Sequence, residues 1–153
     1  MNKGWIWLDM DGTIADLYGV DGWLDDLENF RTRPYENANM IYDLLKIMPI
    51  LCELKMNGYK IGIISWGSKA HNDNYDEAVK EAKLAWLRKY LFDAILDKVI
   101  VTAYGVRKAD TCRKYGKGIL VDDEEQNRNA WDLGGTIDAT ENILTELEKL
   151  IRG

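Results

Sequence analysis

The sequence predicts an α/β fold, a Rossmann-like three-layer α/β/α sandwich built around a mostly parallel sheet. Short apolar runs alternate with longer amphipathic stretches, the runs are apolar on both faces, and several of them end at a polar residue. Strands that are apolar on both faces are typical of parallel sheets covered by helices on both sides. The chain has 153 residues, the usual length of one domain, so we expect a single domain over residues 1–153.

The predicted strands are short runs of aromatic and branched residues. In chain order they are Trp5–Leu8, Tyr59–Ile64, Val99–Val101, Ile119–Val121 and a last run near Thr136–Ile137. The first run ends at Asp9, the second at Ser65 and the fourth at Asp122–Asp123. Ligands of such sheets bind beyond the carboxyl ends of the strands, so we expect these polar residues to converge in one crevice.

The amphipathic stretches between these runs predict the helices. They lie at Pro49–Met56, Tyr75–Tyr90, Glu124–Leu133 and Glu141–Ile151. Proline suits the first turn of a helix, which places the start of the first one at Pro49, and Asn57–Gly58 supplies its end.

Charge and composition exclude several classes of protein. The net charge of −6 argues against a generic nucleic-acid binder, which usually carries a basic surface. A single histidine, His71, rules out a multi-histidine zinc site, and Cys52 and Cys112 lack the spacing of metal ligands. No apolar run approaches the ~20 residues that span a bilayer, and no signal peptide is evident. We therefore expect a cytoplasmic protein that makes no contact with membranes.

The segment Asp9-Met10-Asp11-Gly12-Thr13 follows the first strand and carries two carboxylates on one tight turn. A carboxylate can attack a phosphoryl group to form an aspartyl-phosphate, and a second one can protonate the leaving oxygen and later activate water. Both steps need a divalent cation to offset the charge of the phosphate, and oxygen ligands suit Mg²⁺. The alternative is an ordinary polar turn, because Asp, Gly and Thr are common in turns.

Two further positions can hold a phosphate. The hydroxyl of Ser65 and the backbone N–H groups of the segment Ser65–Ser68 lie at a strand end, although a plain turn explains them equally well. Lys108 lies 14 residues before Asp122, near the start of a predicted helix, and can neutralise phosphate charge. Arg107 and Lys114 are alternatives for this role.

Asp122 and Asp123 are two adjacent carboxylates at the end of a buried strand. Their charges repel each other, and a bound cation relieves that repulsion. A helix N-cap explains one of the two carboxylates but not both.

Taken together, the order D-x-D-G-T, strand-Ser, Lys, Asp-Asp resembles the motif series of the haloacid dehalogenase (HAD) superfamily of phosphohydrolases, over almost the whole chain. The resemblance implies that Asp9 is the nucleophile and Asp11 the general acid/base. It implies phosphate-binding residues at Ser65 and Lys108, and we expect Trp66, next to Ser65, to belong to the same phosphate-binding site. It implies Mg²⁺ ligands at Asp9, Asp11 (through its carbonyl), Asp122 and Asp123, with the choice within the last pair left open. Many members have a small or amide residue in place of Trp66, whose ring can stack on a nucleobase or shield the site.

In this superfamily, substrate choice usually resides in cap insertions. The stretch at about 14–47 predicts a very small cap-like insertion with short helices around Trp23–Phe30 and Asn37–Lys46, and 102–107 leaves no room for another. We therefore expect an open site, which suits a large substrate or is completed by a second subunit in a homodimer.

The resulting hypothesis is a Mg²⁺-dependent phosphomonoester hydrolase that acts through an aspartyl-phosphate on a small phosphorylated substrate, a nucleotide. The segments Lys83–Leu87 and Leu120–Asp123 look like the cytosolic 5′(3′)-deoxyribonucleotidases, whereas the small cap looks more like polynucleotide 3′-phosphatases. Two alternatives stay open: a phosphatase of polynucleotide 3′ ends or another large substrate, and a non-catalytic phosphate-binding module on the same fold.

Overall fold

A single parallel sheet forms the centre of the molecule. The computed structural model describes the backbone of residues 2–153 and the side chains of all of these except residues 92 and 93. The strands are β1 (Gly4–Leu8), β2 (Tyr59–Trp66), β3 (Lys98–Thr102), β4 (Gly118–Asp122) and β5 (Thr136–Asp138). Every pair is parallel, and the order across the sheet is β3-β2-β1-β4-β5. The predicted strands and the parallel sheet are therefore confirmed.

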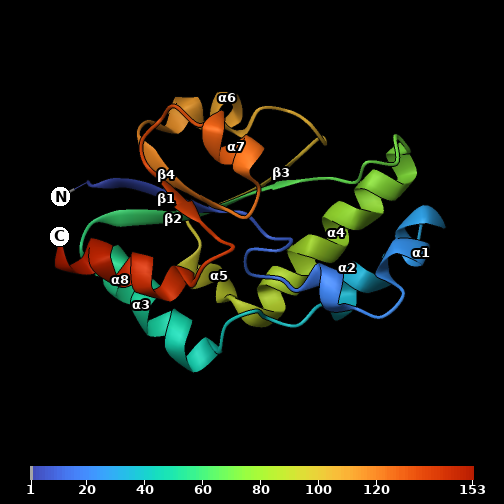
Figure 1. Ribbon diagram of the computed structural model, residues 1–153, viewed down its shortest axis with the longest axis horizontal. Helices are drawn as coiled ribbons and strands as arrows, with labels where there is room; N and C mark the ends of the chain where they lie inside the picture. The colour runs from blue at the N-terminus through green and yellow to red at the C-terminus, as the bar shows by residue number, and fades with distance from the viewer. Residues whose placement is uncertain (1) are drawn as a thin grey trace.

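Helices cover both faces of this sheet (Figure 1). On one face lie α3 (Leu44–Met56), α5 (Phe92–Ile95) and α8 (Ile143–Arg152), and on the other lie α6 (Lys108–Cys112) and α7 (Glu125–Asn129). Successive residues of a strand point to opposite faces, so each strand serves two cores. Ile6 and Leu8 pack on the α3 and α8 side, whereas Trp5 and Trp7 pack on the α6 side. The three-layer α/β/α fold predicted from the sequence is confirmed.

The indole rings of Trp5 and Trp7 fill the core under α6. Both are buried, as expected for core residues, and their rings stack with centroids 4.5 Å apart. Gly62 lies opposite Trp7 in the register of β1 and β2. A Cβ atom at Gly62 would lie only 2.4 Å from the ring of Trp7, so the glycine provides the space that the indole occupies.

The helices depart most from the sequence predictions at three places, while the ends of α1 (Trp23–Glu28), α4 (Asp73–Tyr90) and α8 differ from theirs by one or two residues. α3 begins at Leu44, because the Asp43 side chain accepts a hydrogen bond from the Leu45 N–H at 2.9 Å and caps it, and Pro49 lies inside the helix. The sequence predicted a helix around Asn37–Lys46, and this prediction is wrong. The helix α2 (Arg33–Asn37) ends at Asn37, and the next helix, α3, begins only at Leu44. α7 ends at Asn129 and not at Leu133, because Trp131 turns into the core.

The segment between β1 and α3 forms a small layer beyond the carboxyl ends of the strands (Figure 1). It contains the 3₁₀ helix η1 (Leu17–Gly19), α1 (Trp23–Glu28) and α2, and it packs against α4 (Asp73–Tyr90). Asp26 of α1 is buried and forms ion pairs with Arg31 and Arg33, which join α1 to α2. This layer corresponds to the cap-like insertion predicted at about 14–47.

In the part of the chain that the structure describes, no helix is both long enough and apolar enough to cross a bilayer.

We predict that Gly62→Ala lowers the free energy of unfolding by about 1–3 kcal/mol, because the new methyl group displaces the Trp7 ring from a packed core. Gly135→Ala is the control, since no atom lies within 4 Å of the Cβ it would add. Urea denaturation measures both variants. Equal stability of the two variants would contradict the packing role of Gly62.

Candidate active site

Three carboxylates meet at the carboxyl end of the sheet. Asp9 follows β1 and Asp122 ends β4, and these strands are neighbours in the sheet. With Asp123, each offers one oxygen atom, and the three oxygens lie within 4.8 Å of one another. Asp9 and Asp122 are buried and Asp123 is partly buried. The predicted convergence of these three residues is what the parallel topology produces.

The ammonium group of Lys108 lies between two of these carboxylates. Its Nζ is 2.9 Å from Asp9 Oδ1 and 2.7 Å from Asp122 Oδ2. Burial disfavours the charged amine, but the two carboxylates outweigh this effect and raise the pKa of Lys108. The rival cations lie elsewhere: Arg107 donates to the Ala130 carbonyl, and Lys114 lies over the ring of Tyr115.

One ammonium group does not balance three carboxylates. Burial, together with the charge of Asp9 and a hydrogen bond to it, raises the pKa of Asp123 to about 8. Burial and the charge of Asp9 also raise the pKa of Asp122, against the opposing effect of Lys108. A set of carboxylate oxygens with surplus negative charge is the donor chemistry that a hard divalent cation prefers. The residues Asp9, Asp122 and Asp123 therefore fit Mg²⁺.

Gly12 allows the turn after β1 to lie close to Asp123, the residue that follows β4. Its φ of +81° lies in the left-handed region, which glycine adopts without strain. A Cβ atom there would lie 2.4 Å from Asp123 Oδ2, so a side chain at this position would displace that carboxylate. The glycine of D-x-D-G-T is thus required both for the turn and for the approach of Asp123.

Several residues outside the predicted set hold the acidic cluster. The Thr13 hydroxyl is within hydrogen-bond distance of Asp9 Oδ2, at 3.2 Å, and of Asp123 Oδ1, at 3.3 Å. Asn127 donates its side-chain amide to Asp122 Oδ2 at 3.2 Å. Thr13 belongs to the D-x-D-G-T segment, which is the only sequence signal for it, and Asn127 had none.

Asp11 lies outside the acidic cluster and has a cation of its own. Lys83 of α4 donates from Nζ to Asp11 Oδ2 at 2.8 Å, to Ser65 Oγ at 2.8 Å and to the Trp66 carbonyl at 2.6 Å. Its side chain is only 2 % exposed, so these three acceptors replace water around a buried charge. The carboxylate of Asp11 is therefore not a fourth ligand of the cluster, and a metal contact by its carbonyl stays a prediction.

Lys83 is a third site residue, after Thr13 and Asn127, that was not predicted from the sequence. It lies on the buried face of α4 with Val79, Ala82 and Trp86. A lysine within an apolar stripe was the available signal, because a buried ammonium needs charged or polar partners.

Trp66 lies directly beside the phosphate-binding candidates. Its indole Nε1 donates to the Val106 carbonyl at 2.7 Å, and Lys108 Nζ lies 5.3 Å from the ring centroid. The ring therefore covers Lys108 and limits the access of water to it. Ser65, Trp66 and Lys108 all line one cavity, together with Asp9 and Asp11.

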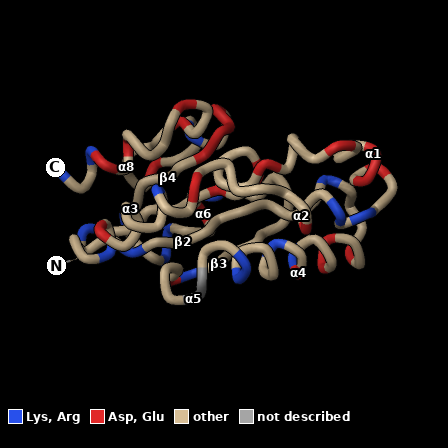
Figure 2. Tube along the Cα trace, turned by 90° about the horizontal axis from the view of Figure 1, so that it is seen from below, with Lys and Arg blue, Asp and Glu red and all other residues tan. Residues whose placement is uncertain are grey.

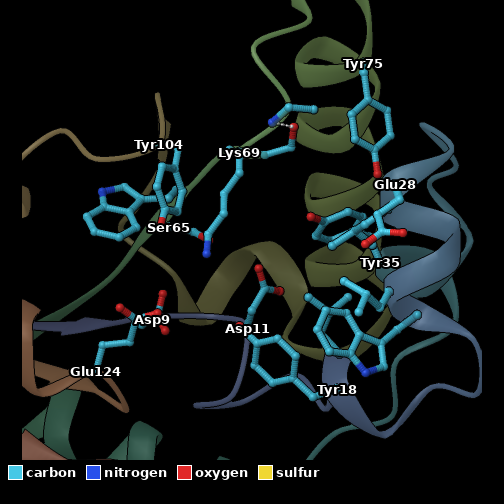
Figure 3. Close-up of a pocket in the computed structure, with 18 of the residues that line it drawn as sticks. Asp9, Asp11, Tyr18, Glu28, Tyr35, Ser65, Lys69, Tyr75, Tyr104 and Glu124 are labelled. Carbon is cyan, nitrogen blue, oxygen red and sulfur yellow. Dashed lines mark hydrogen bonds between the residues drawn. The ribbon is translucent and has the colours of Figure 1, made fainter.

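This cavity has a volume of about 500 Å³ and extends from the acidic cluster to the insertion (Figure 3). One end contains Asp9, Asp11 and Ser65. The other end is formed by α1 and α2 with the segments that flank them, and its lining is mostly apolar and aromatic: Leu17, Tyr18, Trp23, Leu24, Leu27, Phe30 and Tyr35. The insertion thus supplies a whole wall of the cavity, which its short length did not lead us to expect.

Comparison with known proteins adds no assignment. No protein-family model matches this chain, and no curated protein matches it. The geometry of the site is therefore what supports a function.

We predict that Lys83→Met lowers the free energy of unfolding by about 1–3 kcal/mol, because it leaves the Asp11 carboxylate and the Trp66 carbonyl without their donor. Lys80→Met on the same helix is the control, since Lys80 is exposed. Urea denaturation of both variants measures the difference. A loss no larger in Lys83→Met than in Lys80→Met would show that the contacts of Lys83 do not stabilise the fold.

Proposed function

We propose that the protein is a Mg²⁺-dependent phosphomonoester hydrolase of the HAD type that acts through an aspartyl-phosphate on Asp9. The observation that carries this proposal is the position of the Lys108 ammonium between Asp9 and Asp122, in a cavity that Asp11 and Ser65 also line. The order of the motifs along the chain supports the same assignment.

In the first step, a carboxylate oxygen of Asp9 attacks the phosphorus atom of the ester. A bond forms between Asp9 and phosphorus, and the bond from phosphorus to the leaving oxygen breaks. The carboxyl group of Asp11 gives its proton to that leaving oxygen, so that it departs as an alcohol. The contact with Lys83 fixes the position of Asp11 for this transfer.

In the second step, water attacks the phosphorus atom of the aspartyl-phosphate. Asp11, now ionised, takes a proton from the water, the new oxygen–phosphorus bond forms, and the bond between phosphorus and Asp9 breaks. Inorganic phosphate leaves, and both carboxyl groups return to their starting states. Asp11 thus acts as an acid in one step and as a base in the other.

Lys108 and Ser65 bind the phosphate group, and the acidic cluster holds the ion that offsets its negative charge. The ammonium group of Lys108 and the hydroxyl of Ser65 bind phosphate oxygens, and Trp66 shields Lys108 from water. Asp9, Asp122 and Asp123 are the residues that hold Mg²⁺, with the Asp11 carbonyl proposed as a further ligand. When bound, the ion offsets the negative charge of the phosphate and the carboxylates.

A nucleotide is the substrate that we propose for this cavity. The cavity has a volume of about 500 Å³, which lies within the usual range for small-molecule sites, and its end at the insertion is apolar and aromatic. Aromatic side chains contribute on the order of 1–3 kcal/mol to binding by stacking on a base. Trp66, whose ring was expected to stack on a nucleobase or shield the site, lines the cavity, and so does Trp23.

The alternatives receive less support. A polynucleotide 3′ end has to pass the wall formed by the insertion, whose helix α1 carries the exposed acidic residues Asp25 and Glu28 (Figure 2). These charges repel a phosphate backbone. A non-catalytic phosphate-binding module does not need Asp9 and Asp11 in one cavity. A cytoplasmic location and a homodimer stay predictions from the sequence.

We predict that Asp9→Asn abolishes turnover of phosphomonoesters, with a loss on the order of 10⁴-fold or more, because the amide keeps the shape of the side chain but is not a nucleophile. The rate of phosphate release from p-nitrophenyl phosphate with Mg²⁺ measures the effect. Asp73→Asn, at an exposed aspartate outside the cavity, is the control. Activity of Asp9→Asn near that of Asp73→Asn would remove Asp9 from the nucleophile role.

We predict that EDTA abolishes the phosphatase activity and that added Mg²⁺ restores it. The reason is that the surplus negative charge at Asp9, Asp122 and Asp123 requires a bound divalent cation. Mg²⁺ should also raise the Tm of the chelated protein, and by less in Asp123→Asn. Full activity after thorough chelation, or an equal rise of Tm in Asp123→Asn, would contradict the metal site.

A further inference from the structure

The cavity has a second polar group, far from the acidic cluster. Figure 3 shows Asp9 and Glu28 at opposite sides of the cavity, with Asp11 and Tyr35 between them. Glu28 is the last residue of α1, and it lines the end that Leu24, Leu27 and Phe30 make apolar. No ion pair of Glu28 occurs among the side chains that the structure describes. Its carboxylate oxygens are therefore free to accept hydrogen bonds from a ligand.

Phe30 lines the same end and has a strained backbone. Its φ is +57°, in the left-handed region, which is rare for a bulky side chain and costs free energy of folding. The ring is not held there by burial in the core, since the residue is 53 % exposed. It meets the ring of Tyr75 edge-on, with the centroids 5.6 Å apart. The positive φ belongs to the end of α1, where the Arg31 N–H donates to the Asp26 carbonyl at 2.8 Å and the Phe30 N–H to the Leu27 carbonyl at 3.2 Å. This turn leaves the Phe30 ring exposed at the wall of the cavity, where it is available to contact a ligand.

The Tyr75 ring is a fixed part of this wall. Tyr75 is buried, and its hydroxyl donates to the Arg31 carbonyl at 2.8 Å, which joins α4 to the segment after Phe30. The chemistry at this end is thus an aromatic surface next to a carboxylate without a cation. That combination fits a planar ring with N–H donors at its edge.

We propose that this end of the cavity is a guanine subsite, in which Phe30 contacts the face of the base and Glu28 accepts hydrogen bonds from its edge. The inference rests on the proposed function and extends it to one class of substrate, the guanine nucleoside monophosphates. Guanine presents the N1–H and an N2–H side by side, which matches the two oxygens of one carboxylate.

Other bases match Glu28 less well. Adenine and cytosine place a ring nitrogen acceptor beside the amino group, so one carboxylate oxygen faces a lone pair. Uracil and thymine flank their single N–H with two carbonyl oxygens, which the carboxylate repels. Each of these ligands displaces water from the Glu28 carboxylate without offering a donor to both of its oxygens, which disfavours its binding. Glu28 therefore selects guanine over adenine, although the two rings offer Phe30 similar areas.

Binding of GMP and AMP tests the role of Glu28. Isothermal titration into Asp9→Asn with Mg²⁺ measures binding without hydrolysis. We expect GMP to bind between about fivefold and 150-fold more tightly than AMP, the range for one bidentate contact to a base. Adding Glu28→Gln to this protein should bring the GMP-to-AMP ratio of affinities close to one, whereas adding Glu77→Gln, at an exposed glutamate outside the cavity, should leave the ratio unchanged.

The variant Phe30→Gly tests the role of the Phe30 ring. Glycine adopts positive φ without strain, so this variant should have a Tm at least as high as that of the wild type. It should nevertheless bind GMP and AMP more weakly by the same factor, since the stacking surface is lost for both bases. A merely structural role of Phe30 predicts the opposite: a lower Tm and unchanged binding.

The two proposals fail in different ways. Turnover of glycerol 2-phosphate with Mg²⁺ tests the hydrolase alone, since this ester has no base. An active enzyme whose Asp9→Asn form binds GMP and AMP equally, or binds neither, overturns the guanine subsite and leaves the hydrolase intact. An inactive protein that binds GMP selectively through Glu28 supports the subsite and overturns the hydrolase.

Discussion

The ion pairs of Lys108 with Asp9 and Asp122 are the constraint on which the rest of the site depends. The carboxylates lie at the ends of neighbouring parallel strands, both are buried, and Asp123 adds a third negative charge close by. Without a buried cation their repulsion opposes the pairing of β1 with β4 at this edge. Lys108 resolves the conflict because it is the first residue of α6, which packs on the sheet beside these strands. The charge that we propose binds phosphate therefore also holds the strand ends together.

A second lysine keeps the two carboxylates of the D-x-D-G-T turn apart. Lys83 holds Asp11 from α4, whereas Lys108 holds Asp9 from α6, on the other side of the sheet. Asp9 and Asp11 are two residues apart in the chain, yet each lies in its own hydrogen-bond environment. Asp9 belongs to a cluster with surplus negative charge, and Asp11 lies beside an ammonium group and a hydroxyl-bearing residue. That separation is the physical basis for the different roles that we propose for them, Asp9 as nucleophile and Asp11 as acid and base.

The sequence predicted the sheet and the strand-end residues because both follow from short-range patterns. Asp9, Ser65 and Asp122 end apolar runs, and parallel strands bring such ends to one edge whatever the helices do. Lys83 was not predicted because its partners come from two distant strands, and helical spacing shows only that it is buried. The start of α3 was missed because the Asp43 cap outweighs the preference of Pro49 for a first turn, whereas its end at Met56 was predicted correctly. The strain at Phe30 is a property of backbone dihedral angles, which residue types alone do not specify.

Helix α4 fixes the spacing between the two ends of the cavity. Tyr75, which meets Phe30, and Lys83, which holds Asp11, lie on this one helix, and at 1.5 Å per residue they are separated by about 12 Å along its axis. Tyr35 of α2 strengthens the link, since Lys83 Nζ lies 5.3 Å from its ring centroid. A rigid helix therefore sets how far a ligand group at the insertion would lie from Asp11. For the nucleotide that we propose, a small insertion can thus select by length, because it only has to form a wall at the right place on the helix that also holds Asp11.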